Sequence, residues 1–118
     1  MPINYGNPIA KYVETGIAKV GPSTWIRLVA TGTAPLSKRQ WIEIQPRGGG
    51  ALAIAYTNVN SDGSFTAPGY SAQGSKIIPA KGVLKGEPLS DTVMMWGRFV
   101  AKDNTSHGGL KVIVTEYA

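Results

Sequence analysis

The chain has 118 residues, which is the length of one ordinary domain with a modest core. A hydrophobic share of 42% argues against wholesale disorder, and the formal net charge of +5 comes from scattered cations that form no run. The lack of cysteine excludes disulfide and thiolate chemistry. No apolar run approaches the roughly 18 residues of a spanning helix, and the N-terminus lacks a signal-peptide pattern. We therefore expect a soluble protein made in the cytoplasm, with no membrane partner.

The first segment, residues 1–21, mixes glycine and proline with isolated apolar side chains. Glycine and proline disfavour a helix here, so we predict an extended arm with a short strand near residues 17–20. Such an arm can pack on its own domain or on a neighbouring subunit, and both placements stay open at this point.

From residue 23 onward, blocks of β-branched and aromatic residues alternate with turn-forming segments, which is typical of an antiparallel β-protein. In the block 39–45, Ile42 and Ile44 face away from Trp41. The block 51–57 places its larger side chains on one face and its alanines on the other, which predicts close approach of another layer or subunit. The predicted strands cover residues 23–30, 39–45, 51–57, 76–79, 82–85, 93–101 and 110–117.

Turns and loops are predicted where glycine, proline and small polar residues gather. They comprise a hairpin connection over 46–50, turns at 58–63 and 86–88, and loops at 64–74 and 102–109. Within the longest strand, Gly97 predicts a bulge or a close backbone contact. The chain is therefore predicted to be all-β: a single antiparallel β-sandwich or small barrel of about seven or eight strands over residues 22–118, preceded by the arm.

Oxygen-bearing side chains at alternate positions resemble the first half of a calcium loop at Asn58, Asn60 and Asp62. The twelfth position of such a loop would be Gly69, which cannot supply the bidentate carboxylate, so we predict a turn instead. The glycines at 48–50 have no lysine-serine or lysine-threonine successor, so they predict a hairpin tip and no phosphate-binding loop.

His107 is the only histidine, and it lies in a polar loop without a nucleophile elbow or partner ligands. The acidic residues are spread along the chain, with no spacing that pairs two of them for acid–base chemistry. We therefore expect no catalytic residue, no metal site and no cofactor, and we expect that the protein is not an enzyme.

The aromatic residues Trp25, Trp41 and Trp96 lie in predicted strands, two of them near a cation. Aromatic side chains can form a stacking platform for bases or sugars. In strands, however, they more often belong to the core or to a subunit interface. We therefore interpret them as core or interface residues.

Residues 34–45 read Ala-Pro-Leu-Ser-Lys-Arg-Gln-Trp-Ile-Glu-Ile-Gln, a Pro-Leu turn and basic residues before an Ile-x-Ile-Gln strand. An Ala-Ile-Ala-Tyr strand follows at 53–56, an aromatic-glycine strand Met-Trp-Gly-Arg-Phe at 95–99, and Val-Ile-Val-Thr-Glu at 112–116. In these features the chain resembles small β-domain virion structural proteins of tailed bacteriophages. The resemblance implies a capsid-decorating or other particle-surface protein and supplies no active-site residue.

The expected function is therefore that of a non-enzymatic virion structural protein, a capsid decoration or cement protein that binds the head shell as an oligomer. Its partners would be the major capsid protein or another virion protein and further copies of itself, with a trimer among the expected states. It would be assembled in the host cytoplasm and reside in the virion, and nucleic acid is not an expected partner. The expected interface residues are Ile3, Tyr5, Ile9 and Tyr12 on the arm and Trp25, Trp41 and Trp96 on strands.

Two alternatives of other classes stay open. The first is a host-attachment or carbohydrate-binding module of a tail or fibre, which would use Tyr70 and the polar loop 103–107. The second is a single-stranded nucleic-acid-binding barrel with aromatic side chains in a groove.

Overall fold

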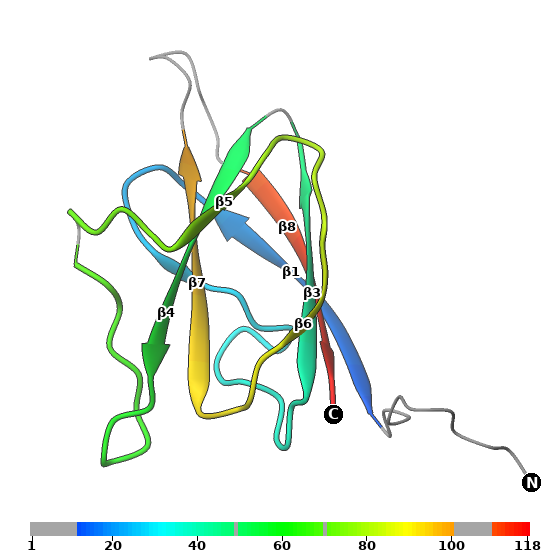
Figure 1. Ribbon diagram of the computed structural model, residues 1–118, viewed down its shortest axis with the longest axis vertical. Helices are drawn as coiled ribbons and strands as arrows, with labels where there is room; N and C mark the ends of the chain where they lie inside the picture. Colours follow the sequence, from blue (N-terminus) through cyan, green and yellow to red (C-terminus); the bar gives the residue numbers. More distant parts are fainter. Residues whose placement is uncertain (1–11, 49, 70, 101–109) are drawn as a thin grey trace, which may run out of the picture.

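The computed structural model describes residues 12–48, 50–69, 71–100 and 110–118. All regular secondary structure in these residues is β-strand (Figure 1). The strands are β1 (Val13–Val20), β2 (Ile26–Arg27), β3 (Trp41–Arg47), β4 (Ala51–Asn58), β5 (Lys76–Ile78), β6 (Leu84–Pro88), β7 (Val93–Val100) and β8 (Leu110–Tyr117). The predicted all-β class is confirmed.

The strands form two four-stranded antiparallel sheets with the orders β1-β8-β3-β6 and β2-β7-β4-β5, which we call sheet A and sheet B. The pairing is nested, because β1 pairs with β8, β2 with β7, β3 with β6 and β4 with β5. This nested order, with all pairs antiparallel, is the topology of a jelly roll, an eight-stranded sandwich of two Greek keys. The sequence predicted a sandwich or a small barrel of seven or eight strands, and the structure is the sandwich, with eight strands among the described residues.

The main core lies between the two sheets. Every second residue of β3 and β8 points into it: Ile42, Ile44, Val112 and Val114 are fully buried. Sheet B contributes Leu52, Ile54 and Met95, also fully buried. The alternation predicted for residues 39–45 is confirmed, and it places Trp41 on the opposite face of sheet A.

The connections differ from the local hairpins that the sequence predicts. All consecutive strands except β4 and β5 lie in different sheets, so residues 48–50 lead from sheet A to sheet B instead of closing a hairpin. The strand predicted over 23–30 is reduced to the two residues of β2, and the connections before and after it lead from and to strands of sheet A. The turn predicted at 86–88 is part of β6, where the single residue Glu43 of β3 faces Lys85 and Gly86 of β6 and Gly86 adopts a φ of +61°.

The segment predicted as an arm is partly a strand of sheet A. β1 pairs with β8 in unbroken register from Val13 opposite Tyr117 to Val20 opposite Leu110. The ladder continues by one residue, because Tyr12 and Ala118 exchange backbone hydrogen bonds of 3.1 and 2.9 Å. The expected boundary near residue 21 therefore does not separate an arm from the body, and residues 1–11 lie outside the described residues.

A second, smaller core lies on the outer face of sheet B, where the alanine face of β4 was predicted to approach another layer. Ala53 and Ala55 pack there with Trp25 and Trp96. The covering layer comes from the same chain, because the long connection from β4 to β5 runs back along the sheet and adds Phe65 (Figure 1). Sheet B is thus covered on both faces along part of its length.

Candidate functional site

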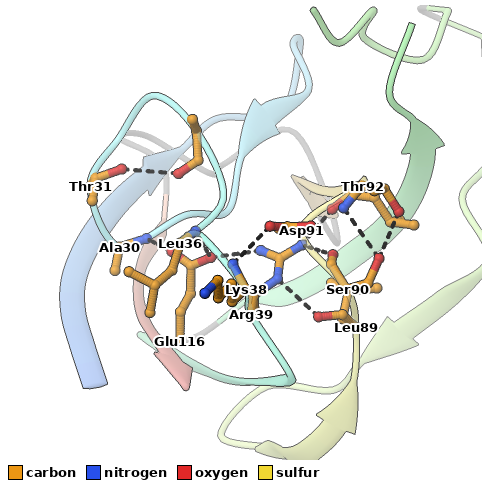
Figure 2. Close-up of polar contacts among 12 residues, drawn as sticks. Ala30, Thr31, Leu36, Lys38, Arg39, Leu89, Ser90, Asp91, Thr92 and Glu116 are labelled. Atoms are coloured by element: carbon orange, nitrogen blue, oxygen red, sulfur yellow. Dashed lines mark hydrogen bonds and ion pairs between the residues drawn. The ribbon is translucent and has the colours of Figure 1, made fainter. Parts of the chain in front are cut away.

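A buried ion pair between Arg39 and Glu116 lies at one end of the sandwich (Figure 2). The Arg39 guanidinium donates to Glu116 Oε2 at 2.7 Å, and both side chains are fully buried. Glu116 also accepts the backbone N–H of Ala30 at 2.7 Å and of Leu36 at 3.0 Å. Arg39 donates further to backbone carbonyls in the β6–β7 connection and at the start of β7. Because every polar atom of the pair is used to join segments of this chain, we assign it a structural role.

A second cluster of polar side chains, Tyr56, Lys76 and Glu87, joins sheet B to β6, an edge strand of sheet A. The Tyr56 hydroxyl donates to Glu87 Oε2 at 2.5 Å, and the Lys76 ammonium pairs with Oε1 of the same carboxylate. Burial, followed by the hydrogen bond to Glu87, raises the pKa of Tyr56 to about 12. The hydrogen bond to Glu87 also raises the pKa of Lys76. These contacts link β4, β5 and β6, and they use both oxygens of the Glu87 carboxylate.

The residues singled out as a possible calcium loop form a turn. Asp62 Oδ1 accepts hydrogen bonds from the backbone N–H and the hydroxyl of Ser64, which lower the pKa of Asp62. The Asn60 amide donates to the Ser64 and Thr66 hydroxyls at 3.1 and 2.9 Å. Across the described ranges, no three His, Cys, Asp or Glu side chains gather closely enough to hold a metal ion.

Several residues considered for function fall outside the described part of the chain. They are Ile3, Tyr5, Ile9, Tyr70, Asp103 and His107. In the described part, no helix is long and apolar enough to span a membrane.

The structure separates the expected interface tryptophans. Trp25 and Trp96 are buried in the second core, with exposed fractions of 7% and 4%. Trp25 Nε1 donates to the Gly69 carbonyl at 3.2 Å and Trp96 Nε1 to the Thr57 hydroxyl at 2.7 Å. Both therefore pack within this chain, and Trp41 is the one of the three that belongs to neither core. Tyr12, from the expected arm, is 68% exposed at the start of β1.

The outer face of sheet A carries side chains of β1, β8 and β3 that point away from the main core. Neither hydrophobic core includes a residue of this face. The cross-strand register arranges its side chains in rows over β1, β8 and β3. The rows are Val13–Tyr117–Trp41, Thr15–Thr115–Glu43, Ile17–Ile113–Gln45 and Lys19–Lys111–Arg47. We call this set of residues the A face.

One end of the A face is aromatic and apolar. The rings of Trp41 and Tyr117 stack with centroids 5.4 Å apart and planes 22° from parallel. Val13, in the same row on the edge strand β1, is 54% exposed, and Ile17, two rows further along β1, is 67% exposed. Stacked aromatic rings beside exposed aliphatic side chains offer a rigid surface that gains free energy when a partner excludes water from it.

A shallow depression of about 420 Å³ lies on sheet B near the exposed Ile77 and Val100. Its charged lining residue is Arg98, which donates to the Ala72 carbonyl at 2.8 Å and lies 4.4 Å from the centre of the Trp25 ring. These contacts hold the covering connection on sheet B, so the depression follows from the packing of the second core and we do not assign it a ligand.

Sequence reasoning named Trp41 but did not place Tyr117, Ile17, Ile113 and the three cations of the last row on the same face as Trp41. Comparison of the chain with protein-family models, with curated proteins and with solved structures finds no match.

Proposed function

We propose that this protein is a non-enzymatic structural component of a virion, a decoration or cement protein that binds the capsid shell through the A face. The observation that carries the proposal is the contrast between the two sheets. The outer face of sheet B is covered along part of its length by the chain's own β4–β5 connection, whereas neither core includes Trp41, Ile17 or Ile113 of the A face, which we propose contact a partner.

Two further features support the proposal. Jelly rolls recur in viral capsid and lectin domains, which is an analogy at the level of fold only. The strand motifs at 34–45, 53–56, 95–99 and 112–116 resemble those of phage virion structural proteins. The mechanism is binding: each copy buries apolar and aromatic surface against the shell and so opposes its opening.

Electron cryomicroscopy of the native assembly that contains the protein tests the proposal. We expect many symmetry-related copies on the outside of a shell, each with the A face at the contact. A few copies at the tip of a tail or fibre would instead favour the host-attachment alternative. Copies lying along single-stranded nucleic acid would favour the nucleic-acid-binding alternative.

A matched pair of variants tests the face itself. Ile17 and Ile77 are both isoleucines of edge strands, 67% and 59% exposed, but Ile17 belongs to the A face and Ile77 to sheet B. We expect Ile17→Ser to reduce co-sedimentation with shells stripped of this protein, and Ile77→Ser to leave it unchanged. Equal losses, or a loss only for Ile77→Ser, would contradict docking through the A face.

A further inference from the structure

The last row of the A face brings together cations that are far apart in the sequence. Lys19 of β1 lies opposite Lys111 of β8, and Lys111 lies opposite Arg47 of β3. All three side chains are exposed. Neighbouring strands lie about 4.8 Å apart, so the row spans roughly 10 Å. Like charges directly opposite each other destabilise a sheet, so the row does not serve the stability of the fold.

No carboxylate of the described residues neutralises this row. Glu116 pairs with Arg39 and Glu87 with Lys76. Asp62 accepts from Ser64, and Asp91 accepts the backbone N–H of Lys38 at 2.8 Å. Glu43 shares the A face but is four residues from Arg47 along β3, which is about 13 Å. Glu14 lies in β1 but in the opposite alternation to Lys19, so it belongs to the other side of the sheet.

We propose that Lys19, Arg47 and Lys111 form an anion-binding row that recognises an acidic protein surface and sets the orientation in which the A face docks. The inference rests on the proposed docking of this face and adds the chemistry of the partner. A partner that presents a line of Asp or Glu carboxylates would receive charge-assisted hydrogen bonds from the ammonium and guanidinium groups. The apolar row of Ile17 and Ile113 lies next to the cations, so the same partner must cover both.

The spacing on the A face favours a protein over a nucleic acid. Single-stranded nucleic acid is bound by aromatic rings that stack on bases beside cations that contact the backbone. Here the aromatic row and the cation row are six residues apart along β3, from Trp41 to Arg47, which is about 20 Å. One face of the Trp41 ring is also occupied by Tyr117. A broad surface with separate apolar and acidic zones matches this layout better than a nucleotide.

The test compares two triple variants of equal net charge. The row variant is K19Q/R47Q/K111Q, and the control is K38Q/K81Q/K85Q, which removes three exposed cations elsewhere. The probe is fluorescently labelled poly-L-glutamate, and its anisotropy gives the Kd at low ionic strength. We expect the row variant to bind about tenfold more weakly than the unmodified protein, since three adjacent ion pairs are lost together. The control should stay within about twofold, and the affinity of the unmodified protein should fall as salt screens the row.

Three results would overturn the inference. Equal losses in the two variants would show that poly-L-glutamate responds only to net charge. Tighter binding of oligodeoxythymidylate than of poly-L-glutamate, lost in the row variant, would assign the row to nucleic acid. Full binding of the row variant to stripped shells would show that docking does not use the cations, although docking through the A face would stand.

The Ile17→Ser variant separates this inference from the proposed function. It should keep the affinity for poly-L-glutamate and lose binding to shells. If neither variant changes shell binding while the row variant loses poly-L-glutamate, the cation row binds acidic chains but the A face does not bind the shell.

Discussion

Arg39 and Glu116, 77 residues apart in sequence, meet at 2.7 Å with no exposure of either side chain. The pair joins three parts of the jelly roll: the β2–β3 connection, the end of β8 and the β6–β7 connection (Figure 2). Both connections cross from one sheet to the other, so the pair holds the two sheets together at this end of the sandwich.

Replacing Arg39 should destabilise the protein strongly. Arg39→Met leaves the Glu116 carboxylate buried without its cation, and breaking a buried pair in this way costs about 3–5 kcal/mol. Urea denaturation should show a lower midpoint with an unchanged slope. Arg47→Met, an exposed arginine of β3, is the control and should stay within about 0.5 kcal/mol. Equal stability of the two variants would mean that the buried pair does not hold the sheets.

The free energy of unfolding should fall at high pH because the Tyr56 phenol ionises. Its pKa is raised from 10.0 when unfolded to about 12 when folded, so folding favours the neutral phenol. The stabilisation is therefore fully present below pH 10 and is lost as the pH rises towards about 12.

Comparison with Tyr56→Phe isolates this effect from the other tyrosines and the lysines, which titrate in both proteins. The difference in unfolding free energy between the unmodified protein and Tyr56→Phe should shrink as the pH rises from 10 to about 12. A difference that is independent of pH would refute the assignment. Spectrophotometric titration should also show a tyrosine that ionises near pH 12 and is missing from Tyr56→Phe.

Adding a methyl group at Gly16 should displace β1. A Cβ atom there would lie 2.0 Å from the carbonyl oxygen of Ala30, a backbone contact that a side-chain rotation cannot relieve. We expect Gly16→Ala to lower the unfolding free energy and to increase hydrogen exchange along β1. At Gly21, close by in the chain, a Cβ would meet nothing within 4 Å, so Gly21→Ala should behave like the unmodified protein. Unchanged exchange in Gly16→Ala would show that β1 does not depend on this contact.

Trp96 should matter mainly for stability, and Trp41 mainly for binding to the shell. Trp96 is 4% exposed and hydrogen-bonded to Thr57, so Trp96→Ala should cost about 3–5 kcal/mol of unfolding free energy. Trp41 is half-buried on the A face, and Trp41→Ala should cost about 1 kcal/mol. In binding to stripped shells the order should reverse: folded Trp41→Ala should bind weakly, whereas any folded Trp96→Ala should bind normally. The same order in stability and in binding would count against the separate roles.

Removing the central cation of the row should stabilise the fold. Lys111 has like charges on both neighbouring strands, so Lys111→Gln should raise the unfolding free energy by a few tenths of a kcal/mol, about the size of a cross-strand charge effect. Lys85→Gln is the control for the loss of one charge. Thermal unfolding at low salt should show the higher midpoint only for Lys111→Gln, and the difference should shrink as salt is added.

The sequence by itself determined the class of fold and the faces of the best-patterned strands. Alternation in the block 39–45 placed Ile42 and Ile44 in the core, because the two-residue period of a strand puts both side chains on the same face. Gly97 was predicted to mark a bulge or a close backbone contact; β7 pairs with β4 there in continuous register, and a Cβ at Gly97 would lie 2.9 Å from the Leu28 side chain. These features are local, so the sequence expresses them directly.

Only the tertiary structure decided which strands are neighbours and therefore which side chains lie close together. Turn signals cannot show whether the chain continues in the same sheet or crosses to the other, because short connections serve both. That choice buried Trp25 and Trp96 inside the chain and left Trp41 outside. It also paired strands from the two ends of the chain, which converts cations at positions 19, 47 and 111 into one row. Charge proximity across a sheet depends on register, and register is set by the packing of the whole core.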